Sequence, residues 1–245
     1  MSTHLTAGIP SWPSRGPRYD RLFFAGIAVL LLATWCVGFA PSYFLAGMLS
    51  AALPSGVVHG HAVVATAWLL LFAVQVSLVS AHRVDLHRRL GVVGFALACL
   101  LVVTGLLSAA DTLRRDVPPG AAHVLFLINT NMALAFAGLM ALAHRTRSNP
   151  PSHKRLIVLA NVALTFAGFI RWPVEPFFHN IPVAARAPYV FLLLMLLYDL
   201  WSARRVHPVT LSAGALLVLL FEAQFFVAET TAWHAVSAWV RSIGS

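Results

Sequence analysis

Charged residues are scarce in this chain of 245 residues, where Asp, Glu, Lys and Arg together make up 10% of the sequence. Soluble globular domains contain about a quarter charged residues, whereas here hydrophobic residues reach 59% and the mean hydropathy is +0.80. This composition excludes a soluble fold and indicates an integral membrane protein. The net charge of +9 comes from short basic clusters between apolar segments. Such clusters are typical of membrane-protein loops, so nucleic acid is excluded as a partner.

Cysteine and lysine are scarcer still. The two cysteines, Cys36 and Cys99, both fall in apolar segments, where they are typical small hydrophobes rather than a disulfide framework. The sequence has no Cys-x-x-Cys-His motif, which excludes covalently attached haem. The only lysine, Lys154, precedes an apolar segment in mid-chain. A retinal Schiff base needs a lysine inside the last helix, so a retinal protein is excluded.

Seven long apolar segments are present, on the scale of the roughly 20 residues that a membrane-spanning helix needs. None alternates as a barrel strand does, so the sequence predicts an all-α, polytopic transmembrane helical bundle. Residues 1–20 lack the apolar stretch and cleavage site of a secretory signal and are expected to form a cytoplasmic tail. Residues 21–230 are expected to form one transmembrane domain, and residues 231–245 an outer tail. The predicted spans cover residues 21–41, 57–80, 88–110, 121–144, 154–172, 187–203 and 209–230.

Basic residues collect on one side of this predicted topology. Of the 17 Lys and Arg residues, 12 fall in the N-terminal tail and the connections on its side, and the other 5 fall on the opposite side. Short cytoplasmic loops carry the excess of basic residues. The N-terminus is therefore expected in the cytoplasm and the C-terminus outside, with the lipid bilayer as the main partner.

Each of the four consecutive spans two to five begins with a histidine, and the membrane side alternates from one span to the next. We therefore expect a four-helix core in which His61 faces His123 near the outer leaflet and His87 faces His153 near the inner leaflet. Two facing imidazoles are suitable axial ligands for a b-type haem, and helical bundles supply them from opposite helices. The two levels would lie about 20 to 25 Å apart, so two haems would carry an electron across the membrane.

His61 is chosen over its neighbour His59 because the two residues point about 200° apart around a helix, and only one of them can face a cofactor. His61 shares its helix face with small and aromatic residues and with Gln75. A different interpretation stays open, since histidines at span ends are often interfacial residues whose rings reach water or lipid headgroups. Four of these histidines lie near arginines in the sequence, as a solvated basic rim would place them: His82, His87, His144 and His153.

The motifs "HGHAVV", "LHRRLG", "HVLFL" and "HKRLIV" at the starts of spans two to five resemble the dihaem cytochrome b-561 and ferric reductase-like superfamily of transmembrane electron carriers. The pieces "LHRRLG" and "HKRLIVLANVALTFAGFIRW" are also similar to a group of uncharacterised bacterial multi-span proteins. The resemblance covers roughly residues 57–172. It implies electron transfer in a bacterial inner membrane by one or two haem b groups, with the axial ligands His61, His87, His123 and His153.

An ionisable side chain at membrane depth is a functional candidate, because lipid makes an unpaired charge costly. Arg171 follows the apolar face of the fifth span, and Glu175 and His179 follow it in "WPVEPFFHN". These residues are expected to form an outer site for a quinol or another small reductant, or an ion pair that orders the loop. Other polar residues in the spans are expected to hydrogen-bond between helices or, in the last span, to be solvated or to assist proton movement: Asn129, Asn131, Asn161, Glu222, Gln224 and Glu229.

Two further functions compete with a cytochrome. A cofactor-free transporter, sensor or assembly partner would need none of the histidines as ligands. A membrane non-haem iron oxidase is suggested by the four histidines expected on the cytoplasmic side, His82, His87, His144 and His153. The chain has no His-His dipeptide, which such enzymes usually contain, and this ranks the oxidase last.

Overall fold

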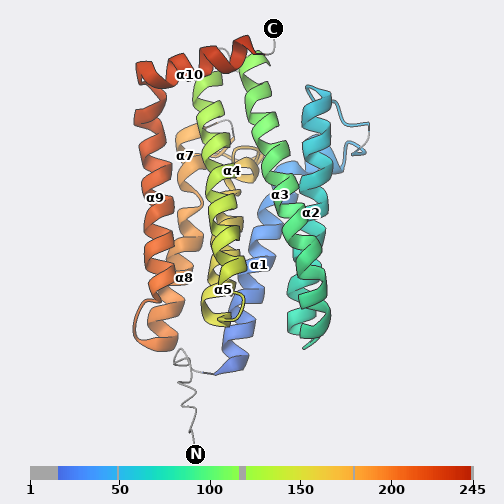
Figure 1. Cartoon of the computed structure of the whole chain (residues 1–245), viewed down its shortest axis with the longest axis vertical. Coiled ribbons are helices and arrows are strands. Elements are labelled where there is room, and N and C mark those ends of the chain that lie inside the picture. The colour runs from blue at the N-terminus through green and yellow to red at the C-terminus, as the bar shows by residue number, and fades with distance from the viewer. Residues whose placement is uncertain (1–15, 49, 116–119, 179, 244–245) are drawn as a thin grey trace, which may run out of the picture.

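The computed structural model describes residues 16–48, 50–115, 120–178 and 180–243 of the chain. Within these ranges the regular secondary structure is entirely helical, and the long helices run side by side in an elongated bundle (Figure 1). This confirms the predicted all-α helical bundle. The elements are α1 (Pro17–Phe39), the π-helical turn η1 (Ala40–Phe44), α2 (Gly56–Ser80), α3 (Val84–Arg115), α4 (Ala122–Arg145), α5 (Pro150–Ala163), α6 (Phe166–Phe169), α7 (Ile181–Arg186), α8 (Tyr189–Ala203), α9 (Pro208–Ala228) and α10 (Thr231–Ser242).

Six helical segments of the described chain are long and apolar enough to cross a membrane, so the protein is a multi-pass membrane protein. They are α1 with η1, α2, α3, α4, the segment Ile181–Ala203 and α9. The other predicted span, residues 154–172, is divided into α5 and the short α6. At the division the backbone N–H of Leu164 donates to the Asn161 carbonyl at 3.0 Å, and the Thr165 hydroxyl donates to the Val162 carbonyl at 2.8 Å. These tighter bonds replace the regular helical ladder and interrupt the helix.

The interruption lets α6 pack very closely against α1. A Cβ atom added to Gly38 of α1 would lie 2.3 Å from the carbonyl oxygen of Gly168 in α6, and one added to Gly168 would lie 3.0 Å from the carbonyl oxygen of Thr34. Glycine is needed at position 38 because the two backbones touch there, and a side chain at position 168 would also be tight.

The core of the bundle lies around α4 and α5. Nine of the 14 residues of α5 are buried, whereas α2 and α3 expose large apolar side chains such as Leu70 (65% exposed) and Val92 (74% exposed). Lipid covers such side chains in a membrane protein. The interhelical hydrogen bonds expected of Asn161 and Asn131 are confirmed: Trp68 donates to the Asn161 amide oxygen at 3.0 Å, and Asn131 donates to Gln224 at 3.4 Å.

Two ion pairs tie helices together at the end of the bundle where α1 begins. Arg155 of α5 pairs with Asp199 of α8, and both side chains are 1% exposed. The second Asp199 oxygen accepts the backbone N–H of His207 at 3.0 Å, which fixes the turn before α9. Lys154 pairs with Asp20 of α1.

The connections that carry most of the basic residues gather at this same end (Figure 1). They are the turns between α2 and α3, between α4 and α5, and between α8 and α9, while α10 lies across the opposite end. The arrangement agrees with the predicted separation of basic and less basic loops. We call the end with these basic turns the basic end, and the end crossed by α10 the α10 end.

The segment 231–245 differs from the expected tail, because Thr231–Ser242 forms the amphipathic helix α10. Its Trp233 and Val240 pack on a small apolar cluster formed by α3 and α4, whereas Trp239 remains 64% exposed. A helix lying across the bundle with an exposed aromatic side chain is typical of the membrane interface.

Candidate functional site

The structure brings His87 and His153 together at the basic end. His87 lies in the first turn of α3 and His153 in the first turn of α5, which pack on either side of α4. Their ring centres are 6.4 Å apart and the ring planes are nearly perpendicular, at 78°. The start of α5 is fixed by Asn149, whose side chain caps the helix by accepting the Ser152 N–H, and by the proline at the first helical position.

Each of these two rings has a neighbour at its Nδ1 atom. His153 Nδ1 lies 2.8 Å from the carbonyl oxygen of Ala143 in the last turn of α4. A carbonyl only accepts, so Nδ1 carries the proton and Nε2 carries the free lone pair. A histidine that binds a metal through Nε2 has this tautomer, with the other nitrogen bonded to a carbonyl or carboxylate.

The side chain of Gln75 restrains the ring of His87 through a hydrogen bond of the opposite direction. Its amide lies 2.7 Å from Nδ1 of His87, with its NH₂ group directed to that ring and its oxygen directed to the Gly91 N–H at 3.1 Å. In this orientation Nδ1 of His87 accepts the hydrogen bond, so the neutral ring carries its proton on Nε2, and a metal bound at Nε2 would have to displace that proton.

The expected pair of His61 and His123 is not formed. His61 Nδ1 lies 3.2 Å from the Thr104 hydroxyl of α3. A Cβ atom placed on Gly105 would lie 3.6 Å from His61 and 3.8 Å from Ala133 of α4, so His61 lies at the level of Ala133. His123 precedes Ala133 by ten positions in the same helix, which corresponds to about 15 Å along the axis. The prediction failed because the starts of α2 and α4 are not level.

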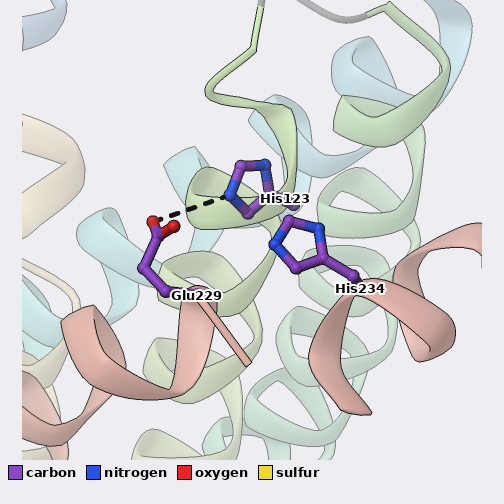
Figure 2. A group of neighbouring side chains, drawn as sticks. All are labelled: His123, Glu229 and His234. Atoms are coloured by element: carbon purple, nitrogen blue, oxygen red, sulfur yellow. Dashed lines mark ion pairs between the residues drawn. The ribbon is translucent and has the colours of Figure 1, made fainter. Parts of the chain in front are cut away.

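His123 instead meets residues of α10 and of the end of α9. Its ring centre lies 4.5 Å from that of His234, and its Nε2 atom lies 3.8 Å from a carboxylate oxygen of Glu229. Figure 2 shows the three side chains directed toward one another.

In the predicted outer reductant site, Arg171 contacts residues other than Glu175. Arg171 donates to the carbonyl oxygen of Ala167 at 2.7 Å, and its guanidinium lies 4.7 Å from the centre of the Phe39 ring. Among the described residues no ion pair joins Arg171 to Glu175, which is exposed. His179 lies outside the described residues.

The four histidines expected on the cytoplasmic side do not form a joint metal cluster in the part of the chain that the structure describes. His82 contacts Arg21 of α1, and His144 packs against Phe95 at 4.5 Å between ring centres. The arrangement therefore gives no support to a multi-histidine iron oxidase.

Sequence reasoning missed His234 and the surroundings of Glu229. His234 lies within the segment 231–245 that was expected to be a tail, and Glu229 lies just before it. The pattern of Trp233, Ser237 and Val240 at helical spacing could have revealed an amphipathic helix there. Glu222, another of the polar residues predicted in the last span, pairs with Arg186 at 2.6 Å and accepts from the Tyr189 hydroxyl at 2.7 Å.

Comparison of the chain with protein-family models, curated proteins and solved structures gives no match.

Proposed function

We propose that the protein is a b-type cytochrome of a bacterial inner membrane, in which His87 and His153 are the axial ligands of one haem near the basic end. The observation that supports this most directly is the 6.4 Å separation of their ring centres. Two imidazoles on opposite sides of one iron have ring centres about 6 Å apart, because each iron–nitrogen bond is about 2 Å and each ring centre lies about 1 Å beyond its nitrogen.

The surroundings of the two rings also suit this role. Ala143 holds His153 in the tautomer that leaves Nε2 available, and Gln75 restrains the ring of His87 from the Nδ1 side. Ligands that are oriented by such neighbours lose less conformational freedom when the metal binds. Arg88, adjacent to His87 in the sequence and exposed, offers a cation for a haem propionate.

We propose one haem rather than two, because His61 and His123 are separated along the bundle. A haem with two imidazole ligands supplies a one-electron carrier. The protein itself would hold this carrier near one membrane face, among helices whose outer surface is apolar. A quinol or another small reductant dissolved in the bilayer is the proposed electron donor.

The test is an absorption spectrum of the full chain, expressed with ample haem and purified in detergent. Oxidised and dithionite-reduced samples should show a reducible Soret band with about one haem per chain, as expected for a single bis-histidine site. The variants His87→Ala and His153→Ala should each lose this band. His144→Ala is the matched control, because His144 lies on the same end of the bundle and is exposed, and it should keep the band.

Two results would contradict the proposal. Colourless protein that is folded by circular dichroism would favour the cofactor-free alternative. Loss of the Soret band in His61→Ala, together with its retention in His153→Ala, would show that the ligands are assigned wrongly.

A further inference from the structure

His123, Glu229 and His234 bring three metal-ligating groups together at the α10 end of the bundle, opposite the end that holds His87 and His153 (Figure 1). We propose that they form a binding site for a divalent first-row transition metal ion, with Zn²⁺ as the reference ion. The ligands come from the start of α4, the residue that ends α9, and α10. One ligand atom of each lies within 4.8 Å of the other two (Figure 2).

Two imidazoles and one carboxylate form a donor set that binds Zn²⁺ and Fe²⁺ in proteins. In a tetrahedral zinc site the ligand atoms are about 2.0 to 2.1 Å from the ion and therefore about 3.3 Å from each other. His123 Nε2 and the Glu229 oxygen are 3.8 Å apart. Glu229 is largely exposed and His234 is exposed, so both side chains can make this small adjustment without disturbing the core.

Buried polar atoms without partners mark the same place. The Nε2 atom of His123 and the hydroxyl oxygen of Ser237 are both buried, and neither has a hydrogen-bond partner among the described residues. Such atoms normally have a partner, because a buried polar atom that loses its hydrogen bonds to water is destabilising unless another group replaces them. A metal ion bound to Nε2 supplies the missing partner of His123.

An open groove of about 470 Å³ adjoins these residues. His123, His234, Ser237 and Arg241 line it, so the two residues with orphaned atoms border the same groove. Three protein ligands leave one position of a tetrahedral ion for water or a small anion. The Ser237 hydroxyl and the Arg241 guanidinium are the groups of the groove that suit such a ligand.

The two histidines are held in place by contacts that do not involve a metal. Trp233, the residue before His234, donates from its indole nitrogen to the backbone oxygen of His123 at 2.9 Å. The same indole stacks on Phe126 of α4 with 5.0 Å between ring centres, and Thr230 caps α10 by accepting the Trp233 N–H at 3.2 Å. The site is therefore largely formed before the ion binds, which favours binding.

The test is zinc binding to the full chain, purified in detergent without a polyhistidine tag and stripped with EDTA. Titration with ZnCl₂ should give about one bound ion per chain and a higher melting temperature, because an ion that binds only the folded state stabilises it. His234→Ala should weaken binding at least about 100-fold, since loss of a direct ligand exceeds the 10- to 100-fold effect of losing an outer partner. Glu229→Gln, which removes the charge and keeps the shape, should also weaken binding.

His59→Ala is the control, because it removes a histidine that is not part of the cluster, and it should bind zinc as the wild type does. His234→Ala should keep the Soret band predicted above, which separates the metal site from the haem site. The proposal is overturned if the folded wild-type chain takes up no stoichiometric zinc. It is also overturned if His234→Ala, folded by circular dichroism, binds zinc with wild-type affinity.

Discussion

Individual polar residues inside the bundle have defined partners, and the buried pair of Arg155 and Asp199 is the clearest case. Both side chains are almost fully buried, so each charge depends on the other for compensation. The Arg155 side chain also donates to the Pro151 carbonyl at 2.9 Å within α5, so its ion pair with Asp199 links the start of α5 to α8. The pair therefore fixes the helix that carries His153.

Removing one charge of the Arg155–Asp199 pair should lower the free energy of unfolding more than removing both charges. Asp199→Asn leaves the Arg155 charge uncompensated and should lower the free energy of unfolding by about 3 to 5 kcal/mol. The double variant Arg155→Met with Asp199→Asn should recover part of this loss, because no buried charge remains. Reversible unfolding in mixed micelles measures the stability of both variants. Equal stabilities of the single and double variants would disprove the coupling between Arg155 and Asp199.

His207 makes stability depend on pH. It lies between α8 and α9, it is buried, and its Nδ1 atom accepts the Val209 N–H at 3.1 Å as the cap of α9. Burial, followed by the positive charge of Arg155, lowers the pKa of His207 from 6.5 to about 4, although the Asp199 charge acts in the opposite direction. Lys154 and Arg205 add to the lowering.

The folded state therefore binds this proton less readily than the unfolded state. The contribution of His207 to the free energy of unfolding is fully present above pH 6.5. It decreases as the pH falls toward 4, by on the order of 2 to 3 kcal/mol in total. His207→Asn preserves a capping oxygen and does not titrate in this range. We expect thermal unfolding to show a smaller loss of stability between pH 7 and 4.5 for this variant than for the wild type. Identical pH profiles of the two proteins would exclude His207 as the cause.

At the scale of elements, the contact between α1 and α6 depends on the absence of a side chain. Gly38→Ala would place a methyl group 2.3 Å from the Gly168 carbonyl oxygen, so the helices must separate. We expect a loss of about 1 to 3 kcal/mol. Gly26→Ala is the control in the same helix, because nothing lies within 4 Å of its added Cβ atom.

The two glycine variants should therefore differ clearly in melting temperature. Gly26→Ala should be neutral or slightly stabilising, since alanine favours a helix by up to about 1 kcal/mol over glycine. Equal melting temperatures for both variants would show that α1 and α6 do not pack as closely as the distance indicates.

At the scale of the whole molecule, the ends of the bundle predict which residues face each side of the membrane. Ser148 lies between α4 and α5 at the basic end, and Ala235 lies on α10 at the other end; both are exposed. In a background without Cys36 and Cys99, Ser148→Cys should react with an impermeant thiol reagent from the cytoplasmic side only. Ala235→Cys should react from the opposite side only. Labelling of both variants from the same side would contradict the arrangement of the helices.

The sequence by itself determined the membrane class, the approximate helices and the clustering of basic connections. Lipid permits only segments that satisfy their own backbone hydrogen bonds, so apolar runs of sufficient length must become helices, and their positions follow from composition alone. The pair of His87 and His153 was also predicted, because the basic turns place the starts of these two helices at the same end. Whether the pair binds haem stays a prediction.

Only the tertiary structure decided which side chains meet. The rotation and axial offset of each helix depend on packing, such as the Gly38–Gly168 contact, and no residue pattern within one span specifies them. For this reason His61 lies about 15 Å along the bundle from His123, while His123 meets Glu229 and His234. The last segment was predicted as an outer tail, and it forms part of the proposed site because Trp233 docks it on α4.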